Sequence, residues 1–238
     1  MTFQRFYTIP FAGLLLALGM TTAVAQEEGG GARRPTVPSL FMKVEWVRPA
    51  SQADTKVRYI PVQANIADAN AVMQFYGAAG QILTTGNPGN EAAPYGVWSG
   101  TADGPFAITF KHKSGNLMDL SGLGYVRWAV KTSAFHVARP VIRVGGQLLV
   151  ADIEFSAIPK VVTREFSLTN ARWVKLDPNR LVTLNSGPSP TNDVWAPAPD
   201  LTKVEEFGFV DLMPGSGHGT GGWIQIGNVE IFAKSVPK

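Results

Sequence analysis

Apolar and polar side chains alternate along much of this chain, and this period-two pattern predicts β-strands. Phe106, Ile108 and Phe110 fall on one face of the first clear example, and Trp128 lies between inward-facing valines in a second, over 125–131. No window of a dozen residues shows a helical stripe. Further runs of the same kind lie at 72–76, 137–144, 147–153, 161–168, 172–176, 203–210 and 223–233.

Turn residues separate these runs, and the strands with their turns predict the fold class. Gly145-Gly146 and Asp177-Pro178 punctuate the middle of the chain, and a Pro/Ser/Asn stretch covers 187–200. About ten short strands separated by turns are typical of an all-β, two-sheet antiparallel β-sandwich or jelly roll. Pro140 lies inside one run, which predicts that this strand is at a sheet edge or contains a bulge.

The N-terminal segment has the features of a signal peptide. Arg5 precedes an apolar core over 11–20, and Ala23-Val24-Ala25 forms a small-residue cleavage site before Gln26. The alternative is a retained anchor helix, but the apolar run is short for a membrane span. The sequence therefore predicts a signal peptide (1–25), a disordered linker (26–39) and a single β-sandwich domain (40–238). We expect the protein to be exported, periplasmic or extracellular, without a membrane span after cleavage.

Charge and cysteine content exclude several classes of function. Removal of 1–25 takes only Arg5, so 20 Lys+Arg remain against 18 Asp+Glu, a formal charge of +2. This balance, without a basic stripe, predicts no nucleic-acid partner. The absence of cysteine excludes disulfides and thiolate metal sites, so stability must come from the core.

One glycine-rich stretch near the C-terminus carries candidate chemistry. Within 208–223, five glycines of a loop surround His218, while Asp211 precedes that loop and Trp223 closes the segment. Binding residues concentrate on loops held by rigid elements, which favours a recognition loop. The alternative is a long hairpin connection without a ligand, in which Asp211 caps a turn through its side chain.

Catalytic motifs are not found in the sequence. There is no Gly-x-Ser-x-Gly, no His-Glu-x-x-His and no phosphate-binding loop. Three histidines are far apart in sequence, and for His136 a hydrogen-bonded structural role is favoured over catalysis. A glycosidase needs two facing carboxylates, and no spacing pairs any two of the candidates Asp152, Glu154, Asp211 and Glu230.

Tryptophans near strand ends are the remaining resource for recognition. Trp98 and Trp195 stand in polar surroundings, where an indole ring suits the apolar face of a sugar. The alternative is that these rings close the open ends of the sandwich, as large amphipathic aromatic residues often do.

Three segments of the chain resemble known proteins. The segments 119–128 and 135–142, the latter containing Arg139, together with the glycine-rich stretch resemble a largely uncharacterised set of exported bacterial β-sandwich proteins. More remotely, the last third resembles galactose-binding-like jelly rolls that serve as carbohydrate-binding modules. That resemblance implies a sugar ligand. Many such modules also hold a structural calcium, but its ligands cannot be mapped onto residues of this chain.

These observations predict an exported, non-catalytic protein that binds carbohydrate or another cell-envelope ligand. The alternatives are a sugar-processing hydrolase that uses Asp211, His218 and His136, and an envelope protein whose aromatic loops bind another protein. We expect no catalytic residue and no cofactor, and the metal content is open apart from that calcium. The candidate ligand-binding residues are Asp211, His218, Trp223, His136, Arg139, Trp98 and Trp195.

Overall fold

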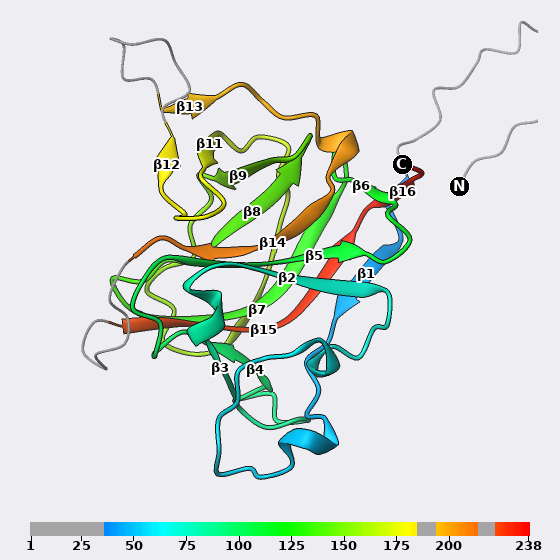
Figure 1. The fold of residues 1–238 in the computed structure, drawn as a ribbon. Coiled ribbons are helices and arrows are strands. Elements are labelled where there is room, and N and C mark those ends of the chain that lie inside the picture. Colours follow the sequence, from blue (N-terminus) through cyan, green and yellow to red (C-terminus); the bar gives the residue numbers. More distant parts are fainter. Residues whose placement is uncertain (1–35, 185–193, 214–221) are drawn as a thin grey trace, which may run out of the picture. The chain divides into compact units, whose positions relative to one another are not determined.

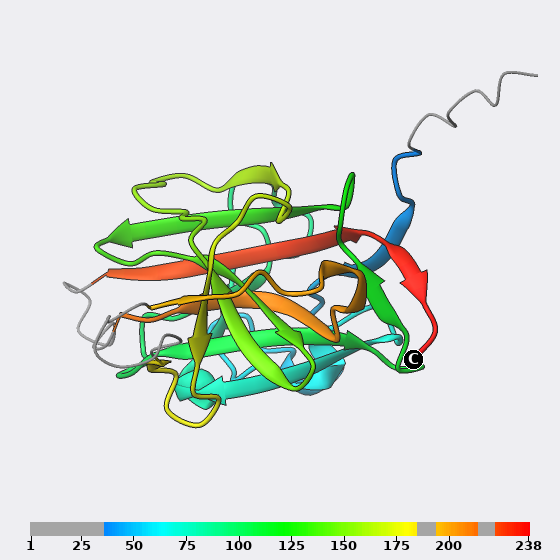
Figure 2. The same cartoon turned by 90° about the horizontal axis from the view of Figure 1, so that it is seen from above.

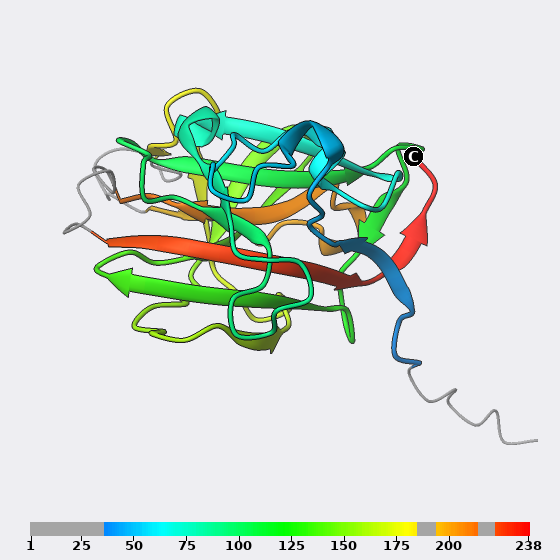
Figure 3. The same ribbon diagram turned by 90° about the horizontal axis from the view of Figure 1, so that it is seen from below.

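Two long antiparallel strands form the centre of the first sheet in the computed structural model, which describes residues 36–184, 194–213 and 222–238. Strands β7 and β15 lie side by side along their whole length, with a bulge between Ile226 and Val229 (Figures 2 and 3). This six-stranded sheet, the smaller sheet, has the order β10-β7-β15-β4-β3, with β1 also beside β15. Its strands are β1 (Leu40–Val44), β3 (Leu83–Thr85), β4 (Gly96–Trp98), β7 (Tyr125–Ala134), β10 (Val162–Phe166) and β15 (Gly222–Phe232).

Eight strands form the second sheet, the larger sheet, which lies against the first (Figure 1). Its order is β12-β11-β9-β8-β14-β5-β2, with β13 beside β11, and all its pairings are antiparallel. The strands are β2 (Ala71–Gly77), β5 (Phe106–His112), β8 (Arg139–Val144), β9 (Gln147–Ala151), β11 (Trp173–Leu176), β12 (Thr183–Leu184), β13 (Trp195–Ala196) and β14 (Glu206–Asp211).

Short elements complete the described part of the chain. Strands β6 (Leu117–Asp119) and β16 (Lys234–Val236) form a separate antiparallel pair. Within the described residues, no helix is long and apolar enough to cross a membrane. The helical turns are η1 (Ala50–Gln52), η2 (Gln63–Asn65), η3 (Ala78–Gln81) and η4 (Leu201–Lys203).

The core lies between the two sheets and follows directly from the alternation in the sequence. Trp128 on β7 is fully buried and packs against Phe155, Phe166 and Phe207. Alternate residues of the larger sheet, such as Phe110, point at it from the other side. Alternation on both sheets sends every second side chain inward, so the next residues along each strand must face outward.

The outer face of the larger sheet carries a second apolar cluster that fills one end of it. Leu181, on the turn after β11, is buried here and reaches across to β2, where a Cβ at Gly77 would lie 2.8 Å from the Leu181 Cδ1. Because β11 and β2 lie far apart in the strand order, the larger sheet is bent into a trough. The members of the cluster are Ala107, Val141, Leu148, Val150, Leu176, Leu181 and Val210.

These sheets confirm the predicted all-β fold, a two-sheet antiparallel β-sandwich of the jelly-roll class. The prediction for Pro140 is wrong, because β8 lies inside the larger sheet between β9 and β14. Proline is tolerated there because the ladder to β9 begins one residue later, at Val141, so Pro140 is in register with β14 only.

Candidate functional site

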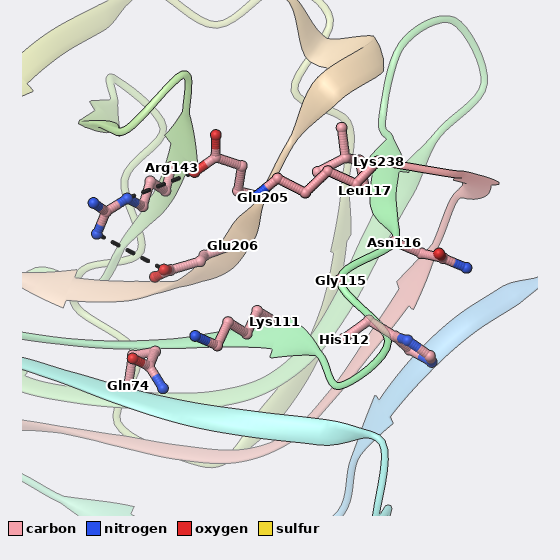
Figure 4. Close-up of a pocket in the computed structure, with 10 residues that line it drawn as sticks. All are labelled: Gln74, Lys111, His112, Gly115, Asn116, Leu117, Arg143, Glu205, Glu206 and Lys238. Carbon is pink, nitrogen blue, oxygen red and sulfur yellow. Dashed lines mark ion pairs between the residues drawn. The ribbon is translucent and has the colours of Figure 1, made fainter.

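The open end of the trough forms a cavity of about 290 Å³ on the outer face of the larger sheet, which we call the polar groove (Figure 4). Strands β2, β5, β14 and β8 contribute Gln74, Lys111, Glu206 and Arg143. Glu206 and Arg143 are directly opposite in the β14–β8 ladder. The groove is lined by Gln74, Lys111, His112, Gly115, Asn116, Leu117, Arg143, Glu205, Glu206 and Lys238.

A buried carboxylate organises the floor of this groove. Glu206 is 5% exposed, and its Oε2 accepts hydrogen bonds from the hydroxyls of Tyr76 at 2.8 Å and Thr109 at 2.5 Å. Its Oε1 lies 3.8 Å from Nη1 of Arg143, which also donates to the Tyr76 hydroxyl at 3.0 Å. A buried charge is tolerated only when it is paired and hydrogen-bonded, and this network meets both conditions.

The same network shifts the protonation of its neighbours. Burial, followed by the hydrogen bond to Glu206, raises the pKa of Tyr76 above its usual value of 10.0. The hydrogen bond to Tyr76 raises the pKa of Arg143 more than burial lowers it. Tyr76 is therefore a neutral hydroxyl and Arg143 a fixed cation at neutral pH, so the groove presents the Arg143 guanidinium in a defined position.

Further polar side chains surround this floor. In Figure 4, Lys111 and Gln74 extend into the space that faces Glu206 and Arg143. Glu205 lies 3.6 Å from Nε of Arg143 and accepts a hydrogen bond from the Gly146 amide at 3.3 Å. Both glutamates thus contact one guanidinium. The groove offers donors and acceptors together, and none of its described carboxylates stands apart from a cation as a general acid would.

Two of the predicted site residues form a buried pair at one end of the sandwich. Nδ1 of His136 lies 2.5 Å from Oδ2 of Asp211, and each side chain is 1% exposed. Asp211 Oδ1 also accepts a hydrogen bond from the Met213 amide at 3.0 Å, the turn-capping role considered for it. Burial raises the pKa of Asp211, against the opposing effect of His136. This pair fastens the end of β14 to the segment after β7 and is closed to ligands.

Other predicted residues lie at two separate places. Trp98 and Trp223 contact each other on the outer face of the smaller sheet, with ring centroids 6.4 Å apart. Arg139 and Trp195 line a cavity of about 230 Å³ over the other end of the larger sheet. There the Arg172 guanidinium lies 4.0 Å from the Trp195 ring centroid, so this ring is partly covered. His218 lies outside the described residues.

The candidate carboxylates are all paired with basic side chains. Each contacts its own cation or histidine: Asp152 pairs with Arg172, Glu154 with Arg139, and Glu230 with Arg127. Within 36–184, 194–213 and 222–238, no group of three His, Asp or Glu residues lies close enough together to hold a metal ion. Among the tryptophans near strand ends, Trp46 and Trp173 belong to the core.

Sequence reasoning missed the polar groove, although a signal for it is present. Glu206 and Arg143 each occupy one position of a strand whose alternate residues are strongly apolar. Such isolated charges on core strands mark an outward row, but only the register shows that the rows of four strands meet. The strand over 203–210 was identified, and the role of Glu206 within it was not.

Comparison with known proteins gives a distant likeness of fold. No protein-family model matches the chain, and no curated protein matches it. Among solved structures, it is similar to the family 11 carbohydrate-binding module of the cellulosomal cellulase Lic26A-Cel5E of Clostridium thermocellum, with 13% identity over 71% of this chain and 90% of that chain, and a TM-score of 0.42.

Two further structures are similar at the same level. One is the family 11 module from Clostridium thermocellum in complex with a β-1,3-1,4-mixed-linked tetrasaccharide, with 14% identity over 72% of this chain and 93% of that chain, at a TM-score of 0.42. The other is an exo-β-agarase, with 14% identity over 76% of this chain and 25% of that chain, at a TM-score of 0.36. A likeness this distant assigns neither a family nor a ligand.

Proposed function

We propose that this protein is an exported, non-catalytic binding protein that recognises carbohydrate through the polar groove. The observation that carries the proposal is the Glu206 network, in which Glu206 and the Tyr76 hydroxyl hold the Arg143 guanidinium in a fixed position at an open cavity. Export, to the periplasm or the cell exterior, is motivated by the N-terminal segment 1–25.

The chemistry of the groove supports a polyhydroxylated ligand. A sugar hydroxyl both donates and accepts hydrogen bonds, and the groove supplies carboxylates, a guanidinium, an ammonium and an amide within one cavity. Because Glu205 and Glu206 neutralise Arg143, the floor favours neutral partners over free ions. Groups held by buried partners lose little freedom on binding, which favours measurable affinity from a shallow site.

A hydrolase that uses Asp211, His218 and His136 is the alternative, and the burial of the Asp211 and His136 side chains argues against it. A general acid or base must come within hydrogen-bond reach of the reacting group. In the groove, the two glutamates contact one guanidinium, an arrangement that suits binding rather than acid catalysis. The structural calcium that the resemblance implies stays a prediction; thermal denaturation with and without a chelator would test it.

A glycan array on the exported protein, followed by calorimetry on the glycans that bind, tests this proposal. Arg143→Ala should weaken binding by about 1.5–3 kcal/mol, the scale of hydrogen bonds to a charged group. Arg164→Ala removes an exposed arginine of β10, on the other sheet, and should leave affinity unchanged. Equal affinity of wild type and Arg143→Ala would overturn the groove as the site, and release of reducing ends from bound glycans would overturn the non-catalytic assignment.

A further inference from the structure

The outer face of the smaller sheet carries a row of side chains that the groove does not use. Lys131 on β7, Gln225 on β15 and Trp98 on β4 are directly opposite one another in the two ladders. Trp223 lies two residues from Gln225 and so shares this face, because the side chains of Ile224 and Ile226 are in the core. One surface therefore combines two indole rings and an ammonium, with the buried Gln225 between them.

Each indole ring on this surface holds a cation. The Arg58 guanidinium lies 4.2 Å from the Trp98 ring centroid, and Lys131 Nζ lies 5.0 Å from that of Trp223. Gly100 lets the Trp98 ring lie on the backbone, since a Cβ there would overlap the indole. The electron-rich ring faces position the cations without neutralising them.

Neither cation has a carboxylate within ion-pair distance among the described residues. Farther along the same face, Arg127 also lies near a ring, that of Phe232, but it contacts Glu165 at 2.9 Å and Glu230 at 3.3 Å. The positive charge of this face is therefore uncompensated at the Trp98–Trp223 end alone, as far as the described residues extend.

A cavity of about 540 Å³ opens beside the Trp223 ring. Trp223 and Lys131 both border it, and Ser133 adds a hydroxyl. Ala157 and Pro159 close the opposite wall. The cavity thus offers an aromatic wall, a cation and a small polar group within one concave surface.

We propose that the Trp98–Trp223 surface, with Arg58 and Lys131, is a second binding site, for an anionic saccharide that carries carboxylate or sulfate groups. The inference rests on the proposed function insofar as the ligand is a saccharide. It adds that the saccharide is anionic and that it binds on a different face of the sandwich. The ring edge and face contact sugar CH groups, while the two cations bind the anionic substituents. The polar groove, whose arginine is neutralised, takes neutral sugar units.

Calorimetry on the exported protein tests this second site with four probes: galacturonate oligosaccharides, sulfated galactan oligosaccharides, neutral galactan oligosaccharides of equal length, and polyglutamate. At least one anionic oligosaccharide should bind about tenfold tighter than the neutral one. The Arg58→Gln/Lys131→Gln double variant should lose this preference. Arg164→Gln/Lys175→Gln removes the same charge elsewhere and should keep it. The two anionic arms distinguish carboxylate from sulfate.

Three outcomes would overturn the second site: an equal loss in the control double variant, polyglutamate binding as tight as that of the saccharides, or an unchanged preference without Arg58 and Lys131. Trp223→Phe, checked for an unchanged denaturation midpoint, should weaken anionic binding and so tests the ring separately. Failure of the groove is distinguishable. Arg143→Ala should lower the affinity for neutral oligosaccharides only. If the wild type binds no neutral oligosaccharide, while anionic oligosaccharides bind both the wild type and Arg143→Ala, the second site is supported and the polar groove is overturned.

Discussion

The two outer faces of the sandwich hold their cations in opposite ways. On the larger sheet, Arg143 is held by two carboxylates and a tyrosine hydroxyl. On the smaller sheet, Arg58 and Lys131 lie over indole rings, with no carboxylate partner among the described residues. The first arrangement neutralises charge and fixes geometry, and the second fixes position but leaves the charge available.

Burial explains why the faces differ. The Glu206 side chain is 7% exposed, so its charge must be paired and its oxygens must be hydrogen-bonded. Tyr76, Thr109 and Arg143 lie against this carboxylate and supply those contacts. The smaller sheet has no comparable cover over Lys131, so solvent stabilises the ammonium and no partner is required. The polar residues on the larger sheet therefore stabilise the fold, whereas those on the smaller sheet are available to ligands.

Replacing a glutamate on each face gives the largest expected effect. Glu206→Ala leaves the hydroxyls of Tyr76 and Thr109 without their acceptor and should lower the free energy of unfolding by about 2–3 kcal/mol. Glu165→Ala on the smaller sheet removes a side chain that is 55% exposed and should leave the urea midpoint unchanged. Equal losses in the two variants would show that the faces do not differ in this way.

Tyrosines provide a smaller and pH-dependent test. Tyr76→Phe removes the hydroxyl that joins Arg143 to Glu206 and should cost about 1 kcal/mol at neutral pH. Because the folded pKa of Tyr76 is raised above 10.0, its contribution is fully present below pH 10 and is lost as pH rises through the folded value. The stability gap between wild type and Tyr76→Phe should therefore narrow in alkali. Tyr125→Phe, on the smaller sheet, is the control, and a gap that widens above pH 10 would contradict the assignment.

The fold was predictable because core strands show a local alternation of apolar and polar residues. Trp128 and Phe110 occupy strictly alternating positions, so their inward direction follows from the sequence alone. Pro140 was misread, since the rule against proline in central strands applies only where both neighbours are in register. The covering of the larger sheet by Leu181 depends on the curvature of the sheet, which no local pattern encodes.

The site was less predictable because its residues come from strands distant in sequence. Tyr76 and Glu206 are 130 residues apart and meet only through the order of β2, β5 and β14. The same holds for His136 and Asp211, 75 residues apart, whose pairing supports the structural role favoured for His136. The sequence predicts Trp98 and Trp223 as binding residues from their places near strand ends, but the cations over their rings are visible only in the structure.

The smallest expected effect tests whether an ion pair alone prevents a cation on the smaller sheet from binding an anionic ligand. Arg127 lies near the Phe232 ring, as Lys131 does near Trp223, and differs in its contacts with Glu165 and Glu230. Glu165→Gln/Glu230→Gln keeps the shape of both side chains and removes only their charge. The denaturation midpoint should stay unchanged, and affinity for anionic oligosaccharides should rise by about threefold, the scale of one exposed charge pair.

A matched variant separates the effect of a residue's position on this face from the effect of the protein's net charge. Glu154→Gln/Asp200→Asn removes the same charge from other parts of the surface, next to Arg139 and Lys203. If Arg127 gains ligand affinity because it is freed beside a ring, only the first double variant binds anionic oligosaccharides more tightly. An equal gain in both would mean that net charge governs binding. The distinction between cations held by carboxylates and cations held by rings would then have no consequence for recognition.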